Sequence, residues 1–229
     1  MKKIKNPLIR RIPKELIGDW KKYLVVFLFL VLTIGFVSGM YVANESMITS
    51  ANEGVTKYKQ EDGHFELKKQ ADATLLSAIE TGEKADFKAT KTTLYENFFR
   101  NEEEDYNNDG KKDGTIRVFA KTKDINLACM LQGSFPQKAD EIAIDRMHAD
   151  NVGIKVGDTV TVSGETYKVV GLLAYVNYST LHEKTTDLMF DALKFDVAMV
   201  TQDGFDRLHK SIHYTYAWKY ETEPADEAG

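Results

Sequence analysis

The sequence is poor in cysteine, and Cys129 is the only one among its 229 residues. A single thiol cannot form a disulfide within the chain, so a small secreted scaffold held by disulfides is excluded. Cys129 lies in the apolar run NLACML, where we expect it to be buried. Two catalytic motifs are also missing, the phosphate-binding G-x-x-x-x-G-K-[ST] and the nucleophile elbow G-x-S-x-G. The chain therefore carries no P-loop, and we predict that it is not an enzyme.

The chain has few histidines, and they do not gather into a metal-binding motif. His209 and His213 are four residues apart, so on a helix they would share a face and could hold a metal. However, the sequence after them, YTYAWKY, is β-like, and no third ligand is evident nearby. We therefore expect the histidines at the surface, namely His64, His148, His182, His209 and His213.

Charge is absent from residues 23–43, YLVVFLFLVLTIGFVSGMYVA, of which thirteen are Leu, Ile, Val or Phe. As a helix they would be about 32 Å long, against roughly 30 Å of membrane hydrocarbon, and they favour insertion by about 4 to 8 kcal/mol. A cleaved signal peptide is the alternative, but its apolar core would be shorter, and the bulky Tyr41 would stand at position −3 before Ala43. The run predicts an uncleaved transmembrane helix at residues 23–43.

Positive charge gathers before this helix. Residues 1–22 contain eight Lys or Arg and two Asp or Glu, a net charge of +6, while the whole chain carries −5. The positive-inside rule therefore places the N-terminus in the cytoplasm and the main domain outside the plasma membrane. The acidic exterior argues against nucleic acid as a partner, and the basic segment suits anionic membrane lipid. We interpret residues 1–22 as a basic amphipathic cytoplasmic arm, which docks on a partner or only anchors the chain.

The exterior part is long enough for one large core. We divide it into a stalk and mixed α/β subdomain at residues 44–114 and a β-rich core subdomain at residues 115–229. Asn44 to Lys59 could extend the membrane helix outward as the stalk. Helices are predicted at residues 71–80 and in RMHADN, and strands in HFELKK, TTLYENFF, TIRVFA, EIAID, DTVTVSG, ETYKVVGLLAYV, KFDVAMV and YTYAWKY. Because the helices are few and lie between strands, we predict an α+β fold rather than a doubly wound sheet.

One pair of strands shows a clear hairpin pattern. The turn Ser163-Gly164-Glu165 joins DTVTVSG to ETYKVVGLLAYV. Val169 to Leu173 is apolar on both faces, so this strand should lie inside its sheet rather than at the edge. Gly171 within it allows a bend or the close approach of another backbone.

Three ordered motifs resemble the extracytoplasmic core domain of FtsX-like (MacB-type) ABC transporter permeases. Asp140 to Ile144, DEIAI, resembles the strand that follows a Pro-containing loop in that family, here Gly133 to Pro136. Ile154 to Val160, IKVGDTV, resembles its turn into a strand, and Tyr167 to Gly171, YKVVG, resembles its strand after a hairpin. Order and spacing match, and the single membrane helix before the domain is also similar to the family.

The resemblance implies a permease subunit, or the N-terminal part of one, in an ABC-type export or mechanotransmission system. It implies a separate cytoplasmic ABC ATPase as partner, with an exterior domain that transmits or receives motion and holds no cofactor or catalytic residues. Family members carry further membrane helices after the exterior domain, whereas no second apolar run of that length follows here. The single helix would therefore assemble with further permease helices or a second copy. The alternative function is a signal-anchored extracellular binding or sensor module without a transport role.

One acidic segment matches the start of a calcium-binding loop. Oxygen-bearing side chains stand at positions 1, 3, 5 and 9 of the pattern, with Gly110 at position 6, and they are Asp105, Asn107, Asp109 and Asp113. Position 12 is Ile116, where the pattern requires a bidentate Glu, and the flanking sequences do not resemble paired helices. These four residues are a candidate Ca²⁺ site, and an exposed acidic turn containing glycine explains the same letters.

Overall fold

The chain forms two compact units, Met1–Glu53 and Gly54–Gly229, in a computed structural model. The structure describes residues 17–81, 91–178, 180–183, 186, 188–189 and 191–221. Most of the predicted cytoplasmic arm, residues 1–16, lies outside the described residues, as does the end of the chain from residue 222.

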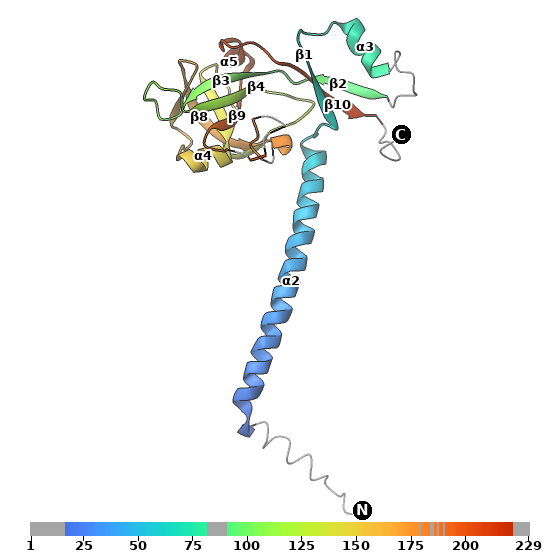
Figure 1. Cartoon of the computed structure of the whole chain (residues 1–229), viewed down its shortest axis with the longest axis vertical. Coiled ribbons are helices and arrows are strands. Elements are labelled where there is room, and N and C mark those ends of the chain that lie inside the picture. Colours follow the sequence, from blue (N-terminus) through green and yellow to red (C-terminus); the bar gives the residue numbers. More distant parts are fainter. Residues whose placement is uncertain are drawn as a thin grey trace, which may run out of the picture. The chain divides into compact units, whose positions relative to one another are not determined.

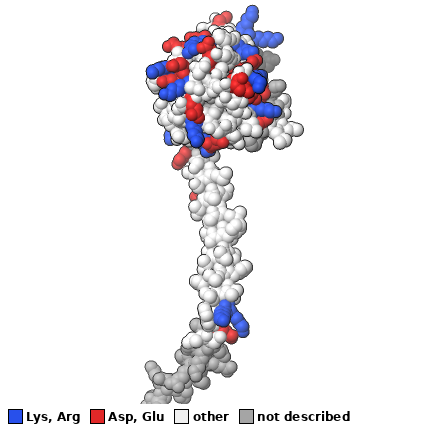
Figure 2. All heavy atoms as spheres, turned by 90° about the vertical axis from the view of Figure 1, so that its left-hand side faces the viewer, with Lys and Arg blue, Asp and Glu red and all other residues white. Residues whose placement is uncertain are grey.

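Helix α2 (Trp20–Lys57) contains the whole predicted membrane segment. By length and composition it can cross a membrane, because an 18-residue window has a mean hydropathy of 2.4 and none of that window is buried. Figure 2 shows its middle part as a stretch of uncharged side chains on the visible face. The helix continues past residue 43 to Lys57, so most of the segment from Asn44 to Lys59 is helical, as expected.

A small antiparallel sheet joins the beginning and the end of the described part of the second unit. Its strands are β1 (Gly63–Leu67), β10 (Tyr214–Tyr220) and β2 (Thr92–Glu96), with β10 in the middle (Figure 1). Helix α3 (Ala73–Thr81) lies between β1 and β2 in sequence. Tyr216 on β10 is fully buried and stacks on Phe65 of β1, so aromatic side chains form the centre of this sheet.

The larger sheet has seven strands in the order β5-β8-β6-β9-β4-β3-β7. The strands are β3 (Phe99–Asp105), β4 (Gly114–Ala120), β5 (Cys129–Gly133), β6 (Glu141–Asp145), β7 (Thr159–Val162), β8 (Glu165–Ala174) and β9 (Phe195–Val200). Because β7 pairs with β8 as well as with β3, six of the strands close into a ring that β5 flanks. The pairs β4–β9 and β6–β8 are parallel and the others antiparallel, so the predicted α+β class is confirmed.

Short helices follow two of these strands, α4 (Arg146–Val152) after β6 and α5 (Gln202–Asp206) after β9. A single 3₁₀ turn, η1 (Val176–Tyr178), follows β8. Side chains alternate between the two faces of each strand, so two apolar clusters form. The inner one draws on five ring strands and includes Ile116, Ile144, Val160, Val169 and Val200, all of which are 0% exposed. The outer cluster includes Phe119, Ala143, Leu173, Phe195 and Met199.

Most predicted strands are present, with informative exceptions. The segment TTLYENFF was expected to be one strand, which is wrong because β2 ends at Glu96 and β3 begins at Phe99. The sequence also gave no sign of β5. Because β3 pairs with β4, the residues before and after position 114 share one sheet. Cys129 is half-buried on β5 rather than fully buried, and its sulfur accepts a hydrogen bond from the Tyr58 hydroxyl at 2.8 Å.

The hairpin and close-approach predictions are confirmed. Ser163 and Gly164 both have positive φ, 47° and 86°, which suits a two-residue turn between β7 and β8. Strand β8 pairs with β5, β6 and β7, so it lies inside the sheet. A Cβ on Gly171 would lie 2.5 Å from the carbonyl oxygen of Ser134, so β5 and its following loop approach β8 more closely than any side chain allows.

Candidate functional site

The four candidate calcium ligands lie together in the loop between β3 and β4. Asp105 accepts hydrogen bonds from the backbone N–H groups of Asp109 (3.1 Å) and Gly110 (2.8 Å). Asn107 donates through its side chain to Asp113 at 3.2 Å and accepts from Asp109 N–H at 2.9 Å. These contacts show that the loop's own backbone occupies several of the oxygens that the calcium pattern would use. The calcium site stays a prediction for Asp105, Asn107, Asp109 and Asp113.

The histidines divide between the surface and the core. His64 pairs with Glu61 at 2.7 Å, and His213 pairs with Glu66 at 2.8 Å, both in partly exposed positions. His209 and His213 do not share a helix, because α5 ends at Asp206 and β10 begins at Tyr214. The surface prediction is wrong for His148, whose side chain is fully buried.

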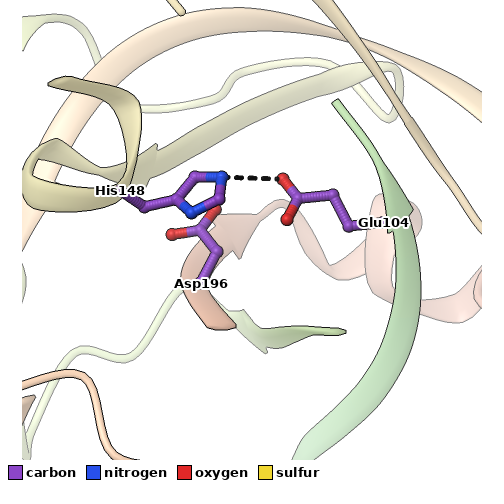
Figure 3. A group of neighbouring side chains, drawn as sticks. All are labelled: Glu104, His148 and Asp196. Carbon is purple, nitrogen blue, oxygen red and sulfur yellow. Dashed lines mark ion pairs between the residues drawn. The ribbon is translucent and has the colours of Figure 1, made fainter. Parts of the chain in front are cut away.

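His148 belongs to a buried cluster with Glu104 and Asp196, which we call the Glu-His-Asp cluster. Strand β6 runs antiparallel to β9, and β3 runs antiparallel to β4, which is parallel to β9. The ends of β3 and β6 and the start of β9 therefore meet at one end of the ring. Glu104 stands at the end of β3, Asp196 at the start of β9, and His148 on α4 directly after β6. Figure 3 shows the three side chains pointing toward one another.

Asp145 fixes the position of His148. It is the N-cap of α4, and its Oδ1 accepts hydrogen bonds from the backbone N–H of Met147 at 2.7 Å and of His148 at 3.4 Å. Its own backbone N–H donates to Asp196 Oδ1 at 3.2 Å. One residue therefore starts the helix that carries the imidazole and also holds the carboxylate beside it.

Few hydrogen bonds satisfy the charged atoms of the cluster. His148 Nδ1 lies 2.8 Å from the Ala192 carbonyl oxygen, and Nε2 lies 3.4 Å from Glu104 Oε1. Asp196 Oδ1 accepts from its neighbour Val197 N–H at 2.7 Å. Among the residues that the structure describes, both Glu104 oxygens, Asp196 Oδ2 and His148 Nε2 have no hydrogen-bond partner of normal geometry. Unsatisfied buried groups of this kind are costly and call for an explanation.

The cluster shifts the pKa values of its members. Burial opposes a charge on His148, but the carboxylates of Asp196 and Glu104 outweigh it and raise the His148 pKa to about 9. Burial raises the pKa of Asp196 well above its usual value, and the nearby His148 opposes that rise. The pKa of Asp145 is also raised by burial, although the helix N–H groups favour its charged form. The cluster thus holds more carboxyl groups than basic groups at the end of the ring where β3 and β6 end and β9 begins.

The wider comparisons give no match in sequence and distant matches in structure. No protein-family model matches the chain, and no curated protein matches it. Among solved structures it is similar to the extracellular domain of the noncanonic ABC-type transporter YknZ from Gram-positive bacteria, with 13% identity and a TM-score of 0.36 over 70% of this chain and 84% of that one. It is also similar to the periplasmic region of MacB from Actinobacillus actinomycetemcomitans, with 8% identity and a TM-score of 0.37 over 66% of each chain. At these scores no residue role is carried over.

The segment that follows α2 is hydrogen-bonded within the second unit. The carbonyl oxygens of Tyr58 and Lys59 accept hydrogen bonds from Leu127 N–H (2.8 Å) and Asn126 N–H (3.0 Å). The buried Asn126 side chain accepts from Glu61 N–H at 3.0 Å and donates to the Glu61 carboxylate at 2.5 Å. We call this set of contacts the Asn126 junction. It ties the chain that leaves the helix to the loop between β4 and β5.

Proposed function

We propose that the chain is a permease subunit, or the N-terminal part of one, in an ABC-type export or mechanotransmission system. Its exterior domain would exchange motion, through the membrane helix, with a cytoplasmic ABC ATPase. Further permease helices or a second copy would complete the path through the membrane, because a single helix encloses none. Membrane lipid surrounds the helix in this arrangement.

The observation that carries the proposal is a membrane-length helix whose following residues are hydrogen-bonded into the domain. A tether of flexible residues would let the domain move without moving the helix. The Asn126 junction instead begins directly after α2 ends at Lys57, where the backbone oxygens of Tyr58 and Lys59 are bonded to the loop between β4 and β5. The motifs DEIAI, IKVGDTV and YKVVG support the same class by their resemblance to MacB-type permeases.

The proposed orientation has the N-terminus in the cytoplasm and the main domain outside. The basic residues 1–22 and the acidic remainder support it by the positive-inside rule. The test replaces Cys129 with Ser and introduces one new thiol, either Lys3→Cys or Leu188→Cys, because Leu188 is 98% exposed. A membrane-impermeant maleimide should label the Leu188→Cys protein on intact cells and the Lys3→Cys protein only after permeabilisation. The reverse pattern would refute the orientation.

The functional test measures ATP turnover in liposomes that contain the chain and an ABC ATPase from the same organism that purifies with it. We expect turnover to depend on the chain, and Asn126→Ala to weaken that dependence while the two proteins still purify together. Gln132→Ala is the matched control, because it removes an exposed amide from β5 outside the junction. An ATPase whose turnover ignores the chain altogether would overturn the proposal.

One observation favours the alternative, an anchored binding or sensor module. A hollow of about 430 Å³ is lined by ionisable side chains that include Glu61, His64, Glu66, Arg117 and His213. Arg117 lies over the ring of Phe99, 4.4 Å from its centroid, and donates to Asn101 at 3.0 Å, so its position is well defined. ATP turnover that does not respond to the chain, with the predicted orientation confirmed, would favour this second function.

A further inference from the structure

We propose that the Glu-His-Asp cluster is a binding site for a divalent transition metal ion, formed by Glu104, His148 and Asp196. The proposal concerns the interior of the exterior domain and does not depend on a role in transport. Each of the three residues offers one ligand atom, and these atoms lie within 4.8 Å of one another. All three side chains are 0% exposed in relative terms.

Charge balance supports a cation at this position. The charged groups that act on Asp196 are His148, Glu104 and Asp145, and only His148 is basic. With Glu104, Asp196 and Asp145 all ionised, even a protonated imidazole would leave an excess of negative charge, which is expensive in a buried position. A divalent cation with a neutral imidazole would neutralise Glu104 and Asp196 together.

The hydrogen bond of His148 prepares its other nitrogen for a metal. The carbonyl oxygen of Ala192 can only accept, so the hydrogen lies on Nδ1, at 2.8 Å from that oxygen. In the neutral imidazole, Nε2 then carries a lone pair directed toward the Glu104 carboxylate, which is also an acceptor. In the imidazolium form a proton on Nε2 lies between these two atoms, and a bound metal ion would take the place of that proton. A backbone carbonyl that fixes the tautomer in this way is a common second partner of metal-binding histidines.

The distance between the two acceptors also suits a metal. A charge-assisted N–H···O bond is usually about 2.7 to 2.9 Å long, whereas His148 Nε2 and Glu104 Oε1 are 3.4 Å apart. Two ligands bound at about 2.0 to 2.2 Å with a tetrahedral angle are separated by roughly 3.3 to 3.6 Å. The third ligand atom, on Asp196, lies within 4.8 Å of the other two, so it has to close by at most about 1.5 Å, which a side-chain rotation provides.

The ligand set favours a transition metal over calcium or magnesium. Two carboxylates and one imidazole are suited to ions such as Zn²⁺, while Ca²⁺ prefers oxygen ligands only. The cluster therefore differs in chemistry from the acidic loop at Asp105 to Asp113. Tyr106 packs edge-on against His148 with ring centroids 5.8 Å apart and lines a surface hollow. A bound ion would join β3, α4 and β9 at the end of the ring.

The test uses the full chain in detergent, stripped with a chelator and then titrated with Zn²⁺. We expect one tightly bound ion per chain by elemental analysis after desalting, and an increase in Tm on loading. Glu104→Gln, His148→Gln and Asp196→Asn should each weaken zinc affinity by about 100-fold or more. His213→Gln is the matched control, because His213 also pairs with a carboxylate, Glu66, but near the surface. The control should bind zinc as the unmodified chain does.

If the variants do not fold, X-ray absorption of the zinc-loaded, unmodified chain tests the proposal by identifying the atoms that bind the zinc. We expect only nitrogen and oxygen neighbours at about 2.0 to 2.2 Å, with a single imidazole and no sulfur at about 2.3 Å. Sulfur in the shell would instead implicate Cys129, and several imidazoles would implicate surface histidines. Either result would overturn the proposal. Two further results would do the same: a folded His148→Gln protein that binds zinc as well as the unmodified chain, or an unmodified chain that retains less than about a tenth of a zinc ion per chain.

Discussion

The close approach of backbones at Gly171 makes a quantitative prediction for Gly171→Ala. The new methyl group would lie 2.5 Å from the Ser134 carbonyl oxygen and 2.7 Å from the Met130 sulfur. The methionine can rotate away, but the Ser134 backbone cannot, because its N–H is bonded to the Val170 oxygen at 2.9 Å. Overpacking of this kind costs about 1 to 3 kcal/mol.

A smaller effect opposes this cost. Replacing glycine with alanine reduces the freedom of the unfolded chain, which stabilises the protein by about 0.4 to 1 kcal/mol. At the middle of each range the net loss of unfolding free energy is about 1.3 kcal/mol. For a domain of this size each kcal/mol changes Tm by about 2 to 4 °C, so we expect Gly171→Ala to lower Tm by roughly 3 to 5 °C.

The assay is thermal unfolding of the full chain in detergent, followed by near-ultraviolet circular dichroism. Gly54→Ala is the matched control, because Gly54 lies in helix α2 and a Cβ there would meet nothing within 4 Å. The control should melt at the same temperature as the unmodified chain or slightly above it, since alanine is the better helix former. If Gly171→Ala melts together with its control, the close approach of β5 to β8 is wrong.

Other predictions concern hydrogen bonds in the same domain. Tyr167→Phe removes the bond from the buried hydroxyl to the Gly204 oxygen (3.2 Å), and should lower the unfolding free energy by about 1 kcal/mol in the same assay. The hydrogen bond with Glu61 raises the pKa of His64, so its stabilisation is present below the unfolded pKa of about 6.5 and is lost as the pH rises through the folded pKa. The Tm difference between the unmodified chain and His64→Gln should therefore be larger at about pH 5.5 than at about pH 8.5; equal differences would contradict this. Asp105→Asn should lower Tm equally in Ca²⁺ and in chelator, because its oxygens bond to the loop backbone. A loss that appears only with Ca²⁺ would instead establish the calcium site.

Local patterns in the sequence were enough to find the helix and the apolar strands. The run at residues 23–43 is long and uncharged, and β6, β8 and β9 are rich in branched apolar residues, so their burial follows from composition alone. The turn at Ser163-Gly164 was also evident, since positive φ favours glycine.

The acidic strand β3 could not be identified in this way. Its sequence FRNEEED looks like an exposed loop, yet Glu102 and Glu104 point inward. Their partners are far along the chain: Glu102 accepts from Lys210 N–H at 2.9 Å, and Glu104 faces His148. Only the folded ring brings these groups together, so propensity at β3 gives the wrong answer.

The buried cluster had a faint signal that could be used in other sequences. Asp196 is the single acid in the otherwise apolar run of β9, whose side chains are all buried. An isolated carboxylate in such a strand needs a partner inside the core. His148 follows the Asp145 cap by three residues, so it lies on the first turn of a short helix that packs on the sheet. The two observations together would have placed His148 in the interior.

The pairing of β1 with β10 joins the first and the last described strands of the chain. Asp62 N–H bonds to the Trp218 oxygen at 3.0 Å, and Tyr220 N–H bonds to the Asp62 carboxylate at 2.8 Å. Residues 62 and 221 lie at the same end of this strand pair, so tension applied between them would separate the strands from that end. The five paired positions would then open one after another, starting with Gly63 and Trp218. The ring of β3 to β9 lies outside that line of force, so it would keep its shape while the small sheet yields.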